Sequence, residues 1–216
     1  CGLREDQLVF SPHAVDNARF SIDRSEEAMI LRQSLEIGEG EIIILFAGKL
    51  EEKKGPILLL EAFIELENPK LTLLFVGNGI LENQLKALAN ESKSRVKFMD
   101  FQNQEYMPVI YQACDLFCLP SKGPGETWGL AVNEAMASGK AVLVSDKVGC
   151  GRDLVNPGVN GDVFLHNVKG ELVKKMARIV ESDDLCGFGK KSKAMIQAWN
   201  FDRSVDSIIS TINKLD

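Results

Sequence analysis

The sequence predicts an α/β protein with a doubly wound, Rossmann-like parallel sheet and helices on both faces of that sheet. The first observation is a series of short, nearly continuous apolar runs that are rich in Ile, Leu, Val and Phe. Runs of this length are typical of strands whose two faces are both covered by helices. The second observation is that segments with helical periodicity separate these runs. Such β-α alternation favours parallel strands joined by right-handed crossovers.

The predicted elements follow one another in a regular order. The apolar runs predicted as strands cover 41–47, 71–77, 95–100, 115–120 and 141–146. Helices are predicted from residues 56, 81, 105 and 129, in the intervals after the strands. After the run GDVFL at 161–165, the pattern predicts three further helices, from 169, 184 and 202. The opening segment is more polar, with a short helix expected near 25–35.

Composition limits the classes of function. The 216 residues carry a formal net charge of -6, whereas proteins that bind nucleic acid backbones usually have a basic excess. No apolar stretch is long enough to span a bilayer. The cysteines contain no C-x-x-C pair of the kind found in zinc and dithiol sites, which predicts a reduced, cytoplasmic setting. They are Cys1, Cys114, Cys118, Cys150 and Cys186.

Ligands of doubly wound sheets bind among the loops that follow the carboxyl ends of the strands. The loop after the first strand reads FAGKLEEKKG and contains Lys49, Lys53 and Lys54. Ammonium groups on a glycine-bounded loop can bind a diphosphate. The alternative for this loop taken alone is a solvated turn whose lysines offset Glu51 and Glu52.

The loops after the second and third strands give weaker signals. FVGNGILENQL (75–85) turns at Gly77 and Gly79, but Glu82 stands where a dinucleotide fingerprint needs its third glycine. A tight turn is therefore the favoured interpretation, with helix-start amides that could approach a ligand. After the third strand, Phe101 and Gln102 stand where a nucleobase could lie against an aromatic face, although such an aromatic is more often packing.

The fourth loop, PSKGPGETWGLAVNEAMASGK (120–140), leads into a helix predicted to start near Thr127 or Trp128, with Thr127 as its N-cap. Such a helix start offers free amides and partial positive charge to a phosphate. Glu126 precedes this helix and Glu134 lies about two turns into it, so the two differ by roughly 80° around the axis. They can border one cleft without contact. Helix-dipole and surface roles are the alternatives for an isolated pair.

Taken together, the loops resemble the C-terminal domain of a GT-B fold glycosyltransferase, specifically the retaining enzymes of glycosyltransferase family 4. ETWGLAVNE (126–134) is similar to the E-x7-E signature of that family, FAGKLEEKKG to its G-R-L-x3-K-G phosphate loop and FVGNG to its V-G-x-G turn. VFSPHAVDNARF (9–20) resembles the preceding interdomain segment, and WNFDRSVDSIISTI (199–212) the closing helix. The resemblance covers essentially the whole chain.

The resemblance implies roles for individual residues. Glu134 would hold the ribose hydroxyls of a nucleotide sugar and Glu126 the hydroxyls of the donor sugar. Lys49 and Lys54 would bind the phosphates. The family commonly has Arg where this chain has Lys49, and Lys keeps the charge but cannot form the two parallel hydrogen bonds of a guanidinium group. The implied catalytic residues are Glu126, Lys54 and Lys49; the implied substrate-binding residues are Glu134, Thr127, Trp128, Gly129, Leu130, Phe101, Gln102, Gly48 and Asn78; no metal ligand is implied.

The implied activity is transfer of a sugar, with retention, from a nucleotide sugar such as UDP-glucose to a glycan or lipid-linked acceptor in polysaccharide or glycoconjugate biosynthesis. The alternatives are a mannosyltransferase that uses GDP-mannose and a non-catalytic nucleotide-sugar binding module. No cofactor or metal is expected, and the sequence contains no D-x-D triplet. An unrelated oxidoreductase or ATPase is disfavoured, because the sequence has no Walker loop and no complete G-x-G-x-x-G.

The resemblance also predicts a domain organisation. Residues 1–24 form an interdomain lead-in, 25–198 the nucleotide-sugar-binding domain, and 199–216 a C-terminal helix that packs toward an N-terminal acceptor domain absent from this chain. The chain alone is expected to be inactive or nearly so and to expose an apolar patch. The full-length protein is expected in the cytoplasm, peripherally at the inner face of the membrane. His13 and His166 are too isolated to suggest a metal site.

Overall fold

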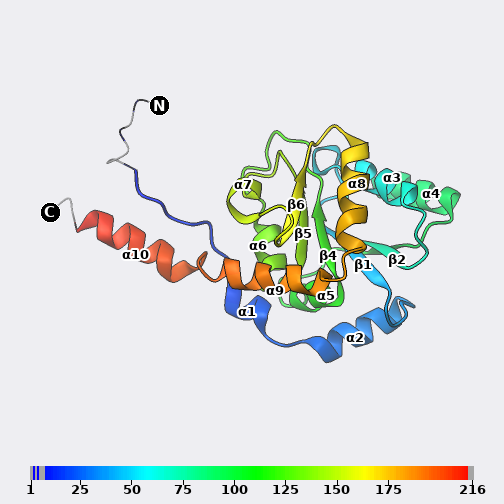
Figure 1. Cartoon of the computed structure of the whole chain (residues 1–216), viewed down its shortest axis with the longest axis horizontal. Helices are drawn as coiled ribbons and strands as arrows, with labels where there is room; N and C mark the ends of the chain where they lie inside the picture. Colours follow the sequence, from blue (N-terminus) through cyan, green and yellow to red (C-terminus); the bar gives the residue numbers. More distant parts are fainter. Residues whose placement is uncertain (1, 3, 5–7, 214–216) are drawn as a thin grey trace.

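A computed structural model describes residues 2, 4 and 8–213 of the chain. Its centre is a six-stranded sheet in which every strand pair is parallel, in the order β3-β2-β1-β4-β5-β6 (Figure 1). The strands are β1 Ile42–Ala47, β2 Leu71–Val76, β3 Val96–Met99, β4 Leu116–Leu119, β5 Ala141–Ser145 and β6 Gly161–Phe164. The predicted doubly wound α/β class is confirmed, and each apolar run predicted as a strand contains one.

Helices connect the strands in the predicted alternation. They are α1 Asn17–Ser21, α2 Ser25–Ser34, α3 Pro56–Glu65, α4 Glu82–Ser92, α5 Met107–Ala113, α6 Leu130–Ala137, α7 Gly151–Leu154, α8 Lys169–Val180, α9 Leu185–Ile196 and α10 Phe201–Ile212, with a short 3-10 helix, η2, at Glu52–Lys54. The sequence analysis missed α1, α7 and η2. All three span five residues or fewer, which is too short for a helical period to repeat.

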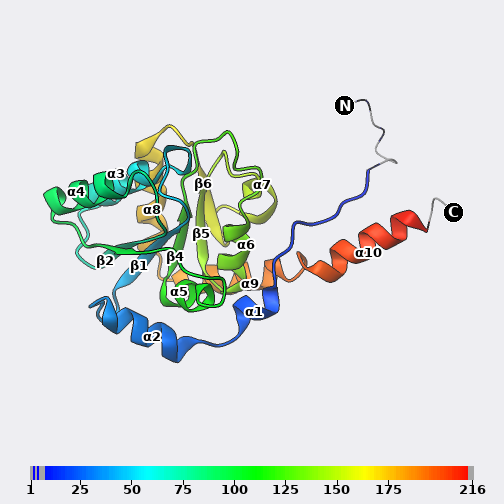
Figure 2. The same cartoon turned by 180° about the vertical axis from the view of Figure 1, so that it is seen from behind.

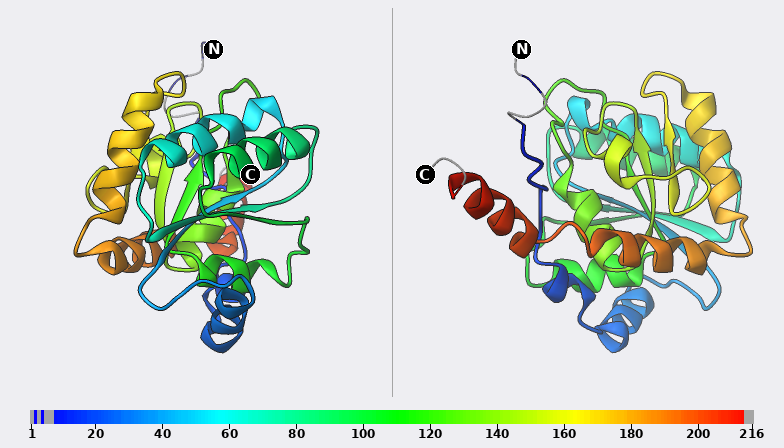
Figure 3. Two further views of the ribbon diagram at one scale, coloured as in Figure 1. Left: turned by 90° about the vertical axis from the view of Figure 1, so that its right-hand side faces the viewer. Right: turned by 60° about the vertical axis from the view of Figure 1, so that its left-hand side comes forward.

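The sheet separates two apolar clusters because side chains alternate along each buried strand. In β1, Ile43 and Leu45 belong to the cluster beneath α5 and α6, whereas Ile44 and Phe46 belong to the cluster beneath α3, α4 and α8. Figure 3 shows these helices on opposite sides of the sheet. Burial on both faces explains why the strand sequences are apolar at almost every position rather than at every second one.

The order of the strands reverses at β1, which pairs with β2 on one side and β4 on the other. The loops that follow β1 and β4 therefore diverge from a common crevice, the usual ligand position in such sheets. They also touch: a Cβ on Gly55 would lie 2.2 Å from the carbonyl oxygen of Pro120, and Gly55 has a φ of +69°. Only glycine allows this close approach without strain.

The prediction that Thr127 caps a helix starting near Trp128 is wrong. Helix α6 begins at Leu130, and its N-cap is Gly129, with a φ of +98° and no side-chain capping bond. A Cβ at Gly129 would lie 2.8 Å from Cγ1 of Val148, so the chain turns there in a conformation reserved for glycine. Since the residues before Gly129 are not helical, the rotation of about 80° inferred between the two glutamates does not apply.

The lead-in and α10 project together from one side of the body (Figures 1 and 2). Not all of the predicted lead-in is peripheral, because Val15 and Phe20 are buried in the core. The apolar side chains along one stripe of α10 are about half exposed, as the sequence analysis expected of this helix; they are Phe201, Val205, Ile208, Ile209 and Ile212. The proposed domain limits at 24 and 198 remain predictions, and Cys1 lies outside the described residues. Among the described residues, no helix is long and apolar enough to cross a membrane.

Candidate functional site

A cavity of about 600 Å³ lies at the carboxyl ends of β1, β2 and β4. Each of the four loops singled out in the sequence contributes to its walls. The predicted site residues that line it are Gly48, Lys49, Lys54, Asn78, Phe101, Gln102, Glu126, Gly129, Leu130 and Glu134. Residues from segments far apart in the chain thus surround one space, because the ends of parallel strands meet at one edge of the sheet.

Glu126 is held by two donors on the wall of the cavity. Its Oε2 atom forms an ion pair with Nζ of Lys54 and accepts a hydrogen bond from Oγ of Ser121 at 2.8 Å. Ser121 is fully buried, and its carbonyl oxygen accepts a bond from the hydroxyl of Ser145. The side chain of Glu126 retains only 11% exposure, and that of Lys54 retains 25%. The carboxylate is therefore held in position by the protein's own side chains.

Glu134 lines the same cavity from α6 and has a different environment. Its Oε2 atom accepts a hydrogen bond from the hydroxyl of Tyr111 at 2.8 Å. Burial raises the pKa of Glu134, while hydrogen bonds from Tyr111 and Gln104 and the charge of Arg19 oppose that rise. Neither glutamate bonds to the other, so the cavity presents two separate carboxyl groups with different neighbours.

Positive potential comes from two lysines and from the start of α6. Lys49 is exposed at the cavity and, within the part of the chain described, forms no ion pair. Gly129, Leu130 and Ala131 line the wall where α6 begins. The first amides of a helix lack carbonyl partners within it and carry partial positive charge. This part of the cavity suits an anion.

One aromatic side chain, Phe101, lies at the edge of the cavity beside the loops after β2 and β3. Asn78 joins these loops, because its Oδ1 accepts from the amide of Phe101 at 2.7 Å and its Nδ2 donates to Asp100 at 2.9 Å. The ring of Phe101 is 74% exposed, and Gln102 bonds to the carbonyl of Asp100. The ring of Phe101 is thus not packed in the core of the described structure, and its contact with a nucleobase stays a prediction.

Thr127 and Trp128 do not line the cavity, although both are among the predicted site residues. The indole of Trp128 lies against the ring of His13, with centroids 4.7 Å apart, and against Trp199 at 5.3 Å. Its Nε1 donates to Oδ1 of Asn133 at 2.9 Å. The positive φ of Gly129 separates this aromatic cluster from the cavity. Thr127 is exposed, and its carbonyl lies close to Gly149.

Residues 28–198 match the family described as Glycosyl transferases group 1. The chain belongs to this family. It is 30% identical over 161 residues to an uncharacterized glycosyltransferase of Methanocaldococcus jannaschii, an alignment that covers 73% of this chain and 40% of that protein. The chain thus spans less than half the length of this curated relative.

Solved structures show which part of the glycosyltransferase fold this is. Anabaena HepE, solved in complex with UDP and glucose, aligns with a TM-score of 0.82 and 23% identity over 99% of this chain and 59% of HepE. The C-terminal domain of LpcC from Francisella tularensis aligns with a TM-score of 0.73 and 20% identity, over 87% of this chain and 100% of that domain. The group 1 domain described here therefore has the fold of the C-terminal half of GT-B glycosyltransferases.

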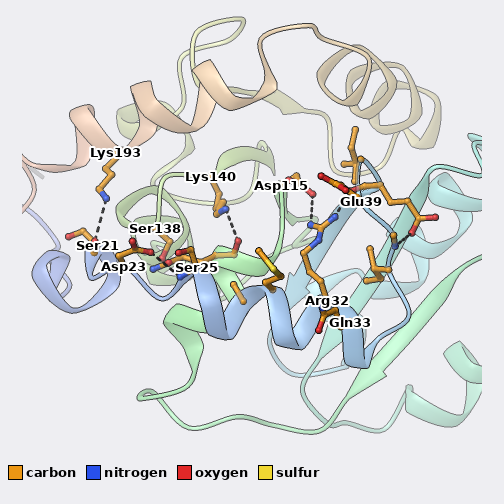
Figure 4. Close-up of a pocket in the computed structure, with 18 residues that line it drawn as sticks. Ser21, Asp23, Ser25, Arg32, Gln33, Glu39, Asp115, Ser138, Lys140 and Lys193 are labelled. Carbon is orange, nitrogen blue, oxygen red and sulfur yellow. Dashed lines mark hydrogen bonds and ion pairs between the residues drawn. The ribbon is translucent and has the colours of Figure 1, made fainter.

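A second, larger cavity of about 1000 Å³ lies at the opposite edge of the sheet of this group 1 domain (Figure 4). Its basic groups are partnered by the protein itself: Arg32 pairs with Asp115 at 3.2 Å, Lys140 donates to a backbone carbonyl at 3.0 Å, and Lys193 to another at 3.4 Å. Doubly wound sheets bind ligands at the carboxyl ends of their strands, not at the amino ends found here. The smaller cavity is the candidate site.

Three residues of the candidate site were not predicted from the sequence: Tyr111, Gln104 and Ser121. A hydrogen bond from Tyr111 could have been expected, because a buried tyrosine hydroxyl usually needs a hydrogen-bond partner. The sequence does not indicate which residue that partner is, because Glu134 lies 23 positions away on another helix. Gln104 and Ser121 carried no comparable signal. Among the described residues, no group of three or more His, Cys, Asp or Glu side chains is arranged to hold a metal ion.

Proposed function

We propose that this chain is the donor-binding domain of a retaining glycosyltransferase and that its 600 Å³ cavity binds a nucleotide sugar. The observation that carries the proposal is the arrangement of two carboxylates, Glu126 and Glu134, with two ammonium groups, Lys49 and Lys54, around one space. Carboxylates accept hydrogen bonds from pairs of hydroxyls, whereas ammonium groups and helix-start amides bind phosphate oxygens. A sugar joined to a nucleoside through a diphosphate offers both kinds of group.

The ligand would lie along the cavity with each part near its chemical complement. The base stacks at the rim beside Phe101, and the ribose diol donates to Glu134. The diphosphate lies between Lys49, Lys54 and the start of α6. The transferred sugar then reaches Glu126. HepE, to which this chain is similar in fold, was solved with UDP and glucose, and this supports a ligand of the same class.

In the proposed reaction, the bond between the anomeric carbon of the sugar and the diphosphate oxygen breaks. The anomeric carbon bonds to the oxygen of an acceptor hydroxyl on the same face, and the proton of that hydroxyl passes to the departing diphosphate. Negative charge grows on the departing diphosphate, so stabilising that charge is the main electrostatic task. Lys49, Lys54 and the α6 amides perform it in this proposal without a metal ion. Glu126 orients the sugar and stabilises the positive charge that develops on its ring.

The finer proposal is a UDP-sugar donor such as UDP-glucose, with a glycan or lipid-linked acceptor. GDP-mannose is the alternative donor, and a binding module without catalysis is the alternative function. UDP and GDP differ in the base alone, so the surroundings of Phe101 and Gln102 select the nucleotide in this proposal, whereas the surroundings of Glu126 select the sugar. Catalysis is decided by whether the full-length protein carries an acceptor-binding domain.

We further propose that the acceptor binds to an N-terminal domain of a longer protein, which works in the cytoplasm with peripheral contact to the membrane. The lead-in and α10 project from the same side of the body (Figure 1), and both expose apolar side chains, including Leu8 and Val9 in the lead-in and the stripe of α10. Contact with a further domain would remove this apolar surface from water. The chain alone would then bind donor with little or no transfer.

A panel of ligands tests the proposal. Saturation-transfer NMR and thermal shift are measured with UDP, UDP-glucose, GDP and GDP-mannose, with free glucose and inorganic phosphate as controls. The proposal expects one nucleotide and its sugar conjugate to bind and to raise the melting temperature, because a ligand that binds only the folded state stabilises it. Absence of binding by all four nucleotides would contradict it, and binding of the guanosine pair alone would select the alternative donor.

A further inference from the structure

The carboxylate of Glu134 is held from one side by a phenol fixed in the core. Tyr111 is fully buried on α5, and its hydroxyl donates to Oε2 of Glu134 at 2.8 Å. Edge contacts hold the tyrosine ring, with centroids 5.8 Å from Phe20 and 5.7 Å from Phe117. Because the aromatic packing fixes the ring, the position of the hydroxyl is set by the core and not by the ligand cavity.

A second donor reaches the same carboxylate from the cavity side. The side chain of Gln104 lines the cavity, and its interaction with the carboxylate lowers the pKa of Glu134. The amide oxygen of Gln104 accepts from Nη2 of Arg19 at 3.3 Å, and the guanidinium of Arg19 lies 5.0 Å from the centroid of Phe20. Since Arg19 belongs to α1, the lead-in helix contributes to the site through Gln104.

The number of lone pairs on the carboxylate agrees with the proposed ligand. An ionised carboxyl group offers roughly four acceptor positions. Tyr111 occupies one of them and the amide of Gln104 is available to a second, which leaves about two for hydroxyl donors. A vicinal diol, such as the 2′ and 3′ hydroxyls of ribose, brings two.

The Tyr111 hydroxyl remains a hydrogen-bond donor because its pKa is raised. Burial, followed by the neighbouring Glu134, raises the pKa of Tyr111 well above its usual value, so the phenol remains protonated at physiological pH. Burial also raises the pKa of Glu134, and the two hydrogen bonds and Arg19 limit that rise. Across the cavity the facing charged groups are Lys49, Lys54 and Glu126.

We propose that Tyr111 and Gln104 are positioning residues that orient the Glu134 carboxylate so that its remaining lone pairs meet the ribose diol. The proposal rests on the proposed function, because it takes the ribose of a bound nucleotide as the partner of Glu134. Neither residue contacts the reacting atoms. Both act through the carboxylate and set the affinity for the nucleoside, whichever sugar is attached.

Tyr111→Phe tests this, with Tyr106→Phe as the matched control, since these are the two tyrosines of the chain. Calorimetry with UDP and GDP is carried out over a series of pH values, so that affinity is followed as Glu134 titrates. Tyr111→Phe should weaken binding of the accepted nucleotide by about tenfold to a hundredfold, the range for a hydrogen bond to a charged group. Tyr106→Phe should bind like the unmodified chain.

The pH profile separates positioning from a general structural effect. The carboxylate form of Glu134 accepts both hydroxyls, so affinity is present above its pKa and is lost as the pH falls through it. Loss of the Tyr111 donor raises that pKa further, so Tyr111→Phe should lose affinity at a higher pH than the unmodified chain. In a Glu134→Gln background the same substitution should have little additional effect. An unchanged profile, or an undiminished loss in that background, would overturn the proposal.

Two further measurements cover the remaining outcomes. If Tyr111→Phe is unstable, Gln104→Leu removes the other donor from an exposed position, and it too should weaken nucleotide binding. A carbon-13 NMR titration of the Glu134 carboxyl without ligand should show a higher pKa in each variant, and an unaltered value would overturn the positioning role. If the unmodified chain binds neither UDP nor GDP, the proposed function itself fails, a result distinct from any failure of the variants.

Discussion

Lys54 and Glu126 form an ion pair across the candidate site, joining the loop after β1 to the loop after β4. The sequence resemblance assigned these residues to different parts of the ligand, Lys54 to phosphate and Glu126 to sugar. In the structure each is the partner of the other. Under the proposed function, a diphosphate would compete with Glu126 for the ammonium group or share it. The proposal therefore makes binding of the diphosphate and binding of the sugar interdependent.

Lys54→Met retains the apolar stem of the side chain and removes its charge. The Glu126 carboxylate, only 11% exposed, then loses its cationic partner. The free energy of unfolding should fall by about 1–3 kcal/mol, the usual cost of an unsatisfied buried polar group, and nucleotide affinity should fall as well. Urea denaturation and calorimetry measure both quantities. Lys53→Met is the control: that lysine is 53% exposed, and its loss should change stability by less than about 0.5 kcal/mol.

Glu126→Gln removes the charge that competes for Lys54 and nearly preserves the shape of the side chain. The ammonium group becomes available to a diphosphate, so free UDP should bind at least as tightly as before. UDP-glucose should lose affinity relative to UDP, because an amide accepts fewer hydrogen bonds from sugar hydroxyls than a carboxylate does. Calorimetry with the two ligands measures the difference, and Glu51→Gln on the neighbouring loop is the control. Equal weakening of both ligands would contradict the assignment of Glu126 to the sugar.

Glu134→Ala should weaken UDP and UDP-glucose alike, because both ligands contain the ribose. The expected loss is about 1.5–3 kcal/mol, the range for hydrogen bonds to a charged group. Calorimetry at a pH above the raised pKa of Glu134 measures it. Glu105→Ala, an exposed glutamate outside the cavity wall, is the control for the change in net charge. Unchanged affinity in Glu134→Ala would remove the ribose from its proposed position.

The strands and the loops that surround the site were predictable because both depend on local patterns. Apolar runs such as 42–47 become central strands when both faces are buried, and parallel strands bring the loops at their carboxyl ends together. Glu126 and Glu134 therefore line one cavity, even though the helical rotation used to relate them was wrong. The conclusion depended on the sheet, not on the start of α6.

The contacts that hold the site residues were not predictable, since their partners are distant in sequence. The bond from Tyr111 to Glu134 joins two helices, and the ring contact of His13 with Trp128 joins the lead-in to the signature loop. No periodicity in a single segment encodes such pairs. Trp128 illustrates the consequence: its place within the motif predicted a cavity-lining residue, but the turn at Gly129 directs its side chain to the aromatic cluster with Trp199.

Gly129→Ala tests whether that turn positions the start of α6. The backbone at Gly129 has a φ of +98°, and a new Cβ would lie 2.8 Å from Cγ1 of Val148, so strain and overlap act together. Unfolding free energy should fall by at least about 1–3 kcal/mol, and nucleotide affinity should fall because the amides of Leu130 and Ala131 shift. Gly158→Ala separates the two effects: its φ is +76°, but no atom lies within 4 Å of the new Cβ. It should lose some stability in urea denaturation and retain full nucleotide affinity. If Gly129→Ala behaved like Gly158→Ala in both measurements, the turn would have no part in presenting those amides to the ligand.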